Sequence, residues 1–229
     1  MIKQEENNIE SERKIVVPGE IIISGNDFLP GEGTRREGRD IVASRYGLAE
    51  ISGRLVKIIA LSGIYMPRRG NVIIGKVNDI TFNGWVMDIN APYLAFLPAA
   101  ECPRFISKDD IASCYSIGDM LVAKVDNVKS KGVDLTIKPK GLGKLDDGLV
   151  IQVNSNKVPR VIGREGSMVN LIKQETNCDI VVGQNGIIWI KGNKIEDELF
   201  AKEVIMFVTE KSHLNGLTER VEEYIRKRK

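Results

Sequence analysis

Short apolar runs separated by turn residues dominate the N-terminal part of the chain and predict strands. Residues 14–24 (KIVVPGEIIIS) read as two short strands around a Pro-Gly turn, and residues 41–61 as further short strands separated by glycine. Between them, the glycine-punctuated residues 30–40 (PGEGTRREGRD) predict a polar loop. The pattern indicates a small β-domain over residues 14–64, preceded by a polar, disordered N-terminus over residues 1–13.

Residues 65–140 have the pattern of a second β-domain. Its strand-like runs are rich in β-branched residues and lie at 71–80, 84–90, 94–101 and 120–138. The last run has the form of a hairpin around Ser-Lys-Gly at 130–132, and residues 107–120 predict a short helical connection. Five strands with one helical interruption are what a small Greek-key barrel of the OB type requires.

Residues 138–148 are rich in Gly, Lys and Pro, have no periodicity, and predict a hinge between domains. After them the pattern changes to a β-α-α-β-β-α order, with the tetrapeptide Gly-Arg-Glu-Gly (163–166) joining the first two helices. The predicted elements lie at 149–153, 156–162, 167–177, 178–183, 186–192 and 194–212. We expect an α/β domain over residues 148–212, a charged C-terminal helix or tail over residues 213–229, and a multidomain α+β fold for the whole chain.

The overall charge of the chain says little about its partners. The formal net charge is only +2, with 33 Lys and Arg against 31 Asp and Glu. Many nucleic-acid-binding proteins are far more basic, so total charge gives weak support to a nucleic-acid interface. Aromatic residues make up only 6% of the chain, so an aromatic side chain on the surface would be informative.

Three scattered cysteines and a single histidine argue against a disulfide framework and against a zinc site. Cys102, Cys114 and Cys178 form no Cys-x-x-Cys pair, so we expect free thiols in a reducing cytosol, and neither a metal nor a cofactor. No nucleophile is paired with a base, which argues against an enzyme. The polar start is not a signal peptide and no run approaches the length of a membrane span, so we expect a cytoplasmic protein.

The Gly-Arg-Glu-Gly tetrapeptide is the strongest candidate for a binding site. Gly163 and Gly166 allow a tight turn, remove side chains that would keep a ligand away, and leave free N–H groups at the start of the following helix. Such a helix start suits a phosphodiester, and Lys157, Arg160 and Lys173 make the surroundings basic. The alternative is a turn between helices with glycines for steric reasons alone, which is the better interpretation for an isolated Gly-x-x-Gly.

In its β-α-α-β-β-α context the tetrapeptide resembles the KH domain, whose Gly-x-x-Gly loop clamps about four nucleotides of single-stranded RNA. The RNA-binding residues that the resemblance implies are Lys157, Arg160, Ile162, Gly163, Arg164, Glu165, Gly166 and Ser167. Among them, Ile162 would line the apolar groove for the bases, and Glu165 would point to solvent because a carboxylate repels phosphate. On this basis we expect Gly163→Asp together with Gly166→Asp to lower RNA affinity while the fold survives.

Residues 75–101 (GKVNDITFNGWVMDINAPYLAFLPAAE) resemble the S-one-type RNA-binding domain, an OB-fold named after a ribosomal protein. In that family, aromatic side chains near the positions of Phe82 and Trp85 lie on the outer face of the barrel and stack on bases, each worth about 1–3 kcal/mol. The candidate phosphate contacts are Lys76, Arg68 and Arg69. Alternatively both aromatic residues belong to the core, because alternation alone does not say which face of a strand is exposed. The chain lacks the histidine that often follows the third strand in this family.

Over about residues 14–212 the order of domains resembles the RNA-binding cap subunits of archaeal exosomes, of the ribosomal-RNA-processing-protein-four type. The segments that carry the resemblance are 17–20 (VPGE), 31–34 (GEGT), 83–98 and 141–168. It implies a non-catalytic subunit, three copies of which sit on a hexameric ring of RNase PH-like subunits. The cap would bind single-stranded RNA and guide its 3′ end into the ring, with the N-terminal β-domain docking on the ring.

Two other functions are open from the sequence. One is a ribonuclease or phosphorylase in its own right, but polynucleotide phosphorylases carry these modules on a much longer chain with a catalytic core. The other is a free-standing RNA-binding regulator of transcription or translation. The regulator predicts a lone monomer, whereas the cap subunit predicts association with ring subunits.

Overall fold

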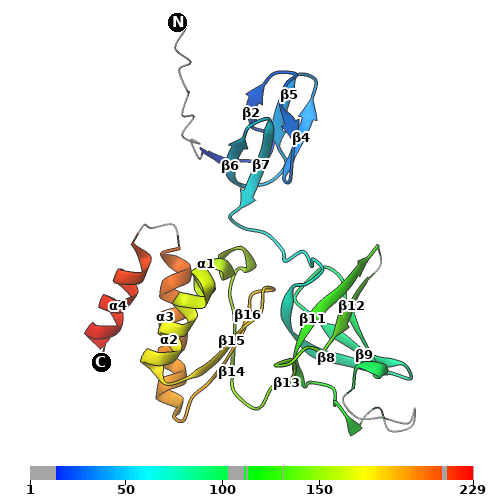
Figure 1. Cartoon of the computed structure of the whole chain (residues 1–229), viewed down its shortest axis with the longest axis vertical. Helices are drawn as coiled ribbons and strands as arrows, with labels where there is room; N and C mark the ends of the chain where they lie inside the picture. Colours follow the sequence, from blue (N-terminus) through cyan, green and yellow to red (C-terminus); the bar gives the residue numbers. More distant parts are fainter. Residues whose placement is uncertain (1–13, 103–110, 112, 131, 213–215, 229) are drawn as a thin grey trace, which may run out of the picture. The chain divides into compact units, whose positions relative to one another are not determined.

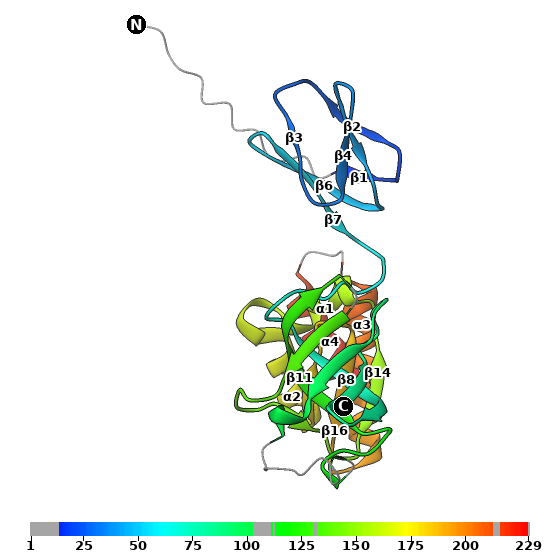
Figure 2. The same ribbon diagram turned by 90° about the vertical axis from the view of Figure 1, so that its right-hand side faces the viewer.

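The computed structural model describes residues 14–102, 111, 113–130, 132–212 and 216–228. It divides into two compact units, one ending at Gly63 and the other starting at Ile64 (Figure 1). The first unit is built from strands, and all four α-helices of the described part belong to the second unit (Figure 2). The predicted multidomain α+β fold is therefore confirmed.

Two small β-sheets form the first unit. The strands are β1 (Lys14–Val16), β2 (Ile21–Ser24), β3 (Leu29–Pro30), β4 (Thr34–Glu37), β5 (Asp40–Ala43), β6 (Gly47–Ser52) and β7 (Leu55–Ala60). They pair in the orders β1-β6-β7-β3 and β2-β5-β4 around a core of Val16, Ala43, Ala49 and Ile58. The prediction of a loop over residues 30–40 is wrong in part, because β4 lies within it and pairs with β5. An edge strand such as β4 tolerates its charged sequence because most of its side chains face solvent.

A closed five-stranded barrel begins the second unit, as an OB-type fold requires. Its strands are β8 (Val72–Thr81), β9 (Gly84–Asp88), β10 (Ala95–Pro98), β11 (Met120–Lys129) and β12 (Gly132–Thr136), with the short 3₁₀ helix η1 (Ala99–Glu101) after β10. The order β12-β10-β9-β8-β11 closes because β12 also pairs with β11, in the hairpin that was predicted around 130–132. The N-terminus over 1–13 and the first part of the helical connection predicted over 107–120 fall outside the described residues.

The connection from β10 to β11 contains a disulfide between Cys102 and Cys114. The expectation that all three cysteines are free thiols is therefore wrong for this pair. The reason lies in the tertiary structure. Both side chains pack against the core of the barrel, so two cysteines 12 positions apart in the sequence meet. Cys178 is free and buried.

The rest of the second unit has the predicted β-α-α-β-β-α order. Its elements are β14 (Leu149–Gln152), η3 (Ser155–Lys157), α1 (Val158–Ile162), η4 (Arg164–Gly166), α2 (Ser167–Thr176), β15 (Asp179–Val182), β16 (Ile187–Lys191) and α3 (Ile195–Glu210). The sheet order is β14-β16-β15, and α1, α2 and α3 cover one of its faces (Figure 1). This is the arrangement expected for a KH domain.

Helix α4 (Leu217–Arg228) packs on α3 through Leu217, Val221 and Ile225. The rings of Phe207 and Tyr224 stack between the two helices, with centroids 4.4 Å apart. The basic C-terminal end is helical through Arg228, which forms an ion pair with Glu203.

The barrel covers the other face of the KH sheet, so both folds belong to one unit. Ile74 and Val122 of the barrel pack with Trp189 of β16 in a shared apolar cluster. The predicted hinge is not a flexible one. Within residues 138–148, the strand β13 (Gly143–Lys144) pairs with β11. The pairing of β13 with β11 and the packing of Leu142 and Leu145 in the same apolar cluster hold this part of the chain in place.

Candidate nucleic-acid interface

The Gly-Arg-Glu-Gly corner exposes main chain at the start of a helix. Helix α1 ends at Gly163 with φ 75°, and Gly166 has φ 82°, so both positions favour glycine. Between them Glu165 also has a left-handed backbone conformation, with φ 52° and ψ 27°, which is uncommon for a residue with a side chain. Glu165 is exposed, as expected.

The two glycines are required for different reasons. A Cβ atom on Gly163 would lie 2.6 Å from the backbone nitrogen of Met168 and 2.8 Å from its Cβ, so a side chain there clashes with the first turn of α2. A Cβ atom on Gly166 meets nothing closer than 3.5 Å, at the amide of Asn170. The expectation that Gly163→Asp leaves the fold intact is therefore wrong at that corner, whereas Gly166 is constrained by its φ alone.

No side chain caps the N-terminus of α2, so the positive end of the helix dipole faces outward uncovered. Arg160 and Arg164 are exposed and Lys157 is half-buried. None of these three cations has an ion-pair partner among the described residues. The N–H groups of Gly166 and Ser167 donate to the carbonyls of Gly163 and Arg164, so what the corner offers is an uncapped helix start beside unneutralised positive charge, a combination that attracts anions.

The remaining residues predicted near the corner lie in two different places. Ser167 begins α2 and is exposed, and Ile162 is half-buried with one side packed on the core. Lys173 lies near the other end of α2, where it lines a separate cavity with Asn177 and Lys191. Lys173 is therefore not part of the cationic group at the corner.

Trp85 is part of the barrel core and cannot stack on a base. Its side chain is 0% exposed, its indole N–H donates to the carbonyl of Tyr115 at 3.0 Å, and the two rings meet edge to face. The prediction of a stacking role for Trp85 is wrong. Along β9, Trp85 and Met87 point inward, whereas Val86 and Asp88 point outward. Trp85 therefore lies on the buried side of the strand.

The other barrel residues predicted to contact RNA are accessible. Phe82 lies in the turn between β8 and β9 and is 73% exposed, so its ring is free to stack. Lys76 is an exposed residue of β8, and Arg68 and Arg69 are exposed in the segment that precedes that strand. All four side chains are therefore accessible to RNA.

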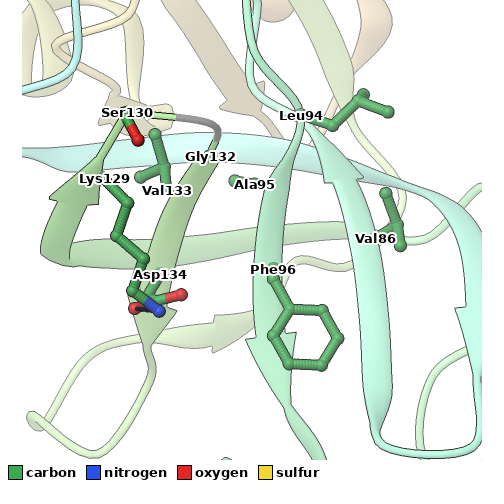
Figure 3. A pocket seen from close by; sticks show the side chains of 9 residues that line it. All are labelled: Val86, Leu94, Ala95, Phe96, Lys129, Ser130, Gly132, Val133 and Asp134. Carbon is green, nitrogen blue, oxygen red and sulfur yellow. Dashed lines mark ion pairs between the residues drawn. The ribbon is translucent and has the colours of Figure 1, made fainter.

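A cavity of about 400 Å³ opens on the outer face of β9, β10 and β12 (Figure 3). Val86, Phe96 and Asp134 form a row across it, since Phe96 lies opposite both of the others in the strand register. Lys129 reaches over its edge and pairs with Asp134 at 2.6 Å. Phe96 thus supplies the outward aromatic ring that was assigned to Trp85. The sequence carried no signal for it, because residues 95–98 are all apolar and their alternation between buried and outward positions appears only in the structure.

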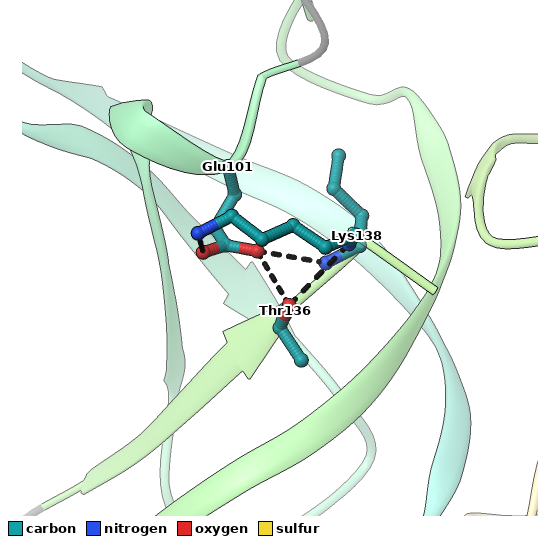
Figure 4. A network of polar contacts seen from close by, with 4 residues as sticks. Glu101, Thr136 and Lys138 are labelled. Carbon is teal, nitrogen blue, oxygen red and sulfur yellow. Dashed lines mark hydrogen bonds and ion pairs between the residues drawn. The ribbon is translucent and has the colours of Figure 1, made fainter. Parts of the chain in front are cut away.

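Glu101 fixes the end of this face (Figure 4). Its carboxylate accepts hydrogen bonds from the hydroxyl of Thr136 at 2.5 Å and the N–H of Ile137 at 3.2 Å, and pairs with Lys138 at 3.0 Å. Partial burial by itself raises the pKa of Glu101. The hydrogen bonds from Thr136 and Lys138 outweigh it, so the pKa lies below its usual value. The network ties η1 to the end of β12 and neutralises Lys138.

Within the described residues, no group of three or more His, Cys, Asp or Glu side chains is arranged to hold a metal ion. A search of the same residues for a helix long and apolar enough to cross a membrane finds none. The features suited to a ligand are the glycine corner, the outer face of the barrel, and the open cavities on the surface of the second unit.

Two family models match this chain, one in each of its two units. A family model described as the KH domain matches residues 148–196, which include the Gly-Arg-Glu-Gly corner. A model described as the N-terminal region of the exosome complex exonuclease RRP4 matches residues 15–52 of the first unit.

Relatives that match most of this chain belong to the same family. The exosome complex component Rrp4 of Methanothermobacter thermautotrophicus is 41% identical over 218 residues, 94% of this chain and 68% of that protein. The protein of the same name from Methanothermus fervidus is 42% identical over 215 residues, 93% of this chain and 96% of that protein. A crystal structure provisionally described as an exosome complex RNA-binding protein superposes with a TM-score of 0.66 at 33% identity, over 72% of this chain and 97% of that chain.

Proposed function

Because the chain belongs to the Rrp4 family of exosome complex components, we propose that it is the RNA-binding cap subunit of a cytoplasmic exosome. In this role it binds single-stranded RNA and guides the 3′ end into a ring of RNase PH-like subunits. It does not cut the RNA itself, and three copies would surround the entrance of the ring. Several modest sites around one entrance raise the effective concentration of RNA there.

The observation that carries the proposal is the uncapped start of α2 beside unpaired cations. Phosphodiester oxygens would lie against the start of α2, near the exposed cations Arg160 and Arg164. Contacts to the backbone do not depend on base sequence, and a subunit that feeds diverse RNAs into a nuclease has to bind in that way.

The barrel supplies the second part of the grip. Phe96 on the outer face and Phe82 in the turn before β9 are the aromatic rings available for stacking on bases. Base stacking tolerates any sequence because every base has a π-face, and it contributes about 1–3 kcal/mol per base. Trp85 has no part in this grip, since it is buried.

The first unit offers a docking surface for the ring. On the outward face of the sheet β1-β6-β7-β3, Ile15, Leu48 and Ile59 form one row, and Leu29 and Leu55 are neighbours at the other end. Four of these five side chains are exposed, at 42–56%, although they belong to a small folded unit. Exposed apolar side chains gathered on one sheet face are typical of a surface that another protein covers.

RNA binding is tested with a variant that leaves both glycines in place. We expect Arg164→Asp with Glu165→Asp to reverse the charge at the corner while Asp, which tolerates the left-handed conformation, replaces Glu165. Fluorescence anisotropy with a single-stranded 12-mer should show about tenfold weaker binding and a shallower dependence of log K on log salt, by about 0.7 per lost phosphate contact. The control is Lys173→Asp, which lies outside the cationic group. Equal loss in both variants, or none in the first, would contradict the clamp.

Association with the ring is tested separately. Leu55→Asp with Ile59→Asp should abolish co-purification with ring subunits while RNA binding is kept. The control is Ile195→Asp with Leu199→Asp, which places the same charge on two exposed apolar residues of α3, 72% and 48% exposed. If the first variant still co-purifies, the docking face is somewhere else, and a protein that purifies alone from native lysate favours the free-standing regulator.

Catalysis by the chain itself is tested by incubating the purified protein with RNA and inorganic phosphate. The cap role requires intact RNA after incubation. Release of nucleotides or nucleoside diphosphates would replace it with an enzymatic function.

A further inference from the structure

A second cavity, of about 410 Å³, lies in the seam between the barrel and the KH sheet. The barrel contributes Lys76, Asp88 and Asn90, and the KH sheet contributes Val150, Gln152 and Ile187. We call it the seam groove. The sequence pattern does not reveal it, because its walls come from strands of two different folds that meet only in the folded chain.

The two walls of the seam groove are held at a fixed distance. Asn185 in the β15–β16 turn is fully buried and hydrogen-bonds to the main chain of Ile74 and Ile89 of the barrel. At the groove itself, the side-chain amide of Gln152 donates to Asn90 at 3.1 Å, and Asn90 donates to the carbonyl of Asn185 at 3.1 Å. A cavity bridged in this way keeps its shape, which a selective binding site needs.

The polar groups in the seam groove suit a base rather than a phosphate. Asp88 is exposed and places a carboxylate in the groove, where it repels a phosphodiester. One of its oxygens accepts the N–H of Asn90 at 2.9 Å, which orients the carboxylate and leaves further acceptor capacity on both oxygens. Lys76 lies opposite Asp88 in the strand register and has no ion-pair partner among the described residues.

We propose that the seam groove binds a guanine base of the RNA. Guanine is the base whose Watson–Crick edge presents two adjacent donors, N1–H and N2–H, beside the acceptor O6. The carboxylate of Asp88 accepts from both donors and the ammonium of Lys76 donates to O6, while Val150 and Ile187 pack against the base face. Adenine and cytosine each place an acceptor where the carboxylate requires a donor, and uracil offers only one donor.

The seam groove is within reach of RNA on the barrel. Val86, in the cavity of the outer barrel face, and Asp88, in the seam groove, both point outward from β9 and are two residues apart. Two residues of a strand span about 6.6 Å. A chain stacked on Phe96 therefore reaches the seam groove without leaving the surface of β9. The inference rests on the proposed RNA-binding function and adds a preference for one base to it.

The test measures base preference with the full-length protein. Three 12-mers are compared by fluorescence anisotropy: oligouridine carrying three spaced guanosines, and the same sequence with inosine or adenosine at those positions. Wild-type protein should bind the guanosine RNA about tenfold more tightly than the adenosine RNA, with the inosine RNA between them because inosine lacks the N2 amine. Asp88→Asn should reduce the preference below about twofold, and Lys76→Met should weaken it through O6.

Asp126→Asn is the matched control, because it removes the same charge from an exposed position of β11 that does not line the seam groove. Both Asp variants should raise affinity for the adenosine RNA through the lost negative charge, but only Asp88→Asn should weaken the binding of the guanosine RNA relative to it and so lose the preference. Binding of the three RNAs within twofold by the wild type, or a preference that survives Asp88→Asn, overturns the inference. Those outcomes leave the proposed function standing, since that depends on the affinity for oligouridine and on the Arg164 and Glu165 variant.

Discussion

Replacing Asn185 with leucine tests whether a single side chain joins the barrel to the KH fold. The pairing of β8 with β9 ends at Lys76 and Asp88, and beyond it the amide of Asn185 takes the place of a continued strand. Its Nδ2 donates to the carbonyl of Ile74 at 2.7 Å and to that of Ile89 at 2.9 Å, and its Oδ1 accepts the N–H of Ile74 at 3.3 Å.

Asn185→Leu keeps the branching and the number of heavy atoms of the side chain but leaves three buried main-chain groups without partners. Each unsatisfied group costs about 1–3 kcal/mol, so we expect the free energy of unfolding to fall by roughly 3–9 kcal/mol. Such a loss is a large fraction of the stability of a typical domain, about 5–15 kcal/mol. Solvent that reaches the groups as the seam loosens would bring the loss toward the lower end of the range.

Urea unfolding followed by tryptophan fluorescence measures this loss in the second unit, to which Asn185 belongs. The chain has two tryptophans, and both Trp85 in the barrel and Trp189 in the seam belong to the unit that starts at Ile64. The control is Gln184→Ala in the same turn, which removes one exposed hydrogen bond to Val72 and should cost below about 1 kcal/mol. A loss no larger for Asn185→Leu than for Gln184→Ala would refute the reasoning.

Three further variants separate stability from binding. Trp85→Phe should lower the free energy of unfolding by about 2 kcal/mol, through lost volume and the lost bond to Tyr115, and leave RNA affinity unchanged in an anisotropy titration. Phe82→Ala should do the opposite, with a stability change within about 0.5 kcal/mol and a loss of about 1–3 kcal/mol of RNA-binding free energy. Because the folded-state pKa of Glu101 is lowered, its stabilising contribution is present above the unfolded-state pKa and is lost as pH falls below about 4.5. Melting temperatures between pH 7 and pH 3 should therefore fall less steeply for Glu101→Gln than for the wild type, and parallel curves would contradict this.

Much of the fold was predictable because its signals are local. The β-α-α-β-β-α order, the hairpin at 130–132 and the strands of the first unit follow from periodicity and turn residues, and the structure has them. The glycine corner was also predictable, since a glycine pair between the first two helices of a β-α-α-β-β-α order is typical of the KH loop. The prediction for residues 30–40 failed because an edge strand reads as a polar loop when most of its side chains face solvent.

The candidate site depended more on contacts across the chain. Trp85 and Phe96 lie on neighbouring strands of one barrel, yet one ring is sealed inside and the other faces outward. Alternation fixes only that adjacent residues point to opposite faces, and which face is wet depends on how the sheet closes. The disulfide between Cys102 and Cys114 was likewise invisible in the sequence, since it depends on where the connection after β10 returns.

The sequence by itself determined the order of the elements, the two glycines of the corner and the family to which the chain belongs. Only the tertiary structure decided that the barrel and the KH sheet form one unit, with Asn185 between them and the seam groove beside it. The physical reason is that periodicity and turn chemistry act over a few residues. A buried amide or a groove, in contrast, is defined by groups that only the closed chain brings together.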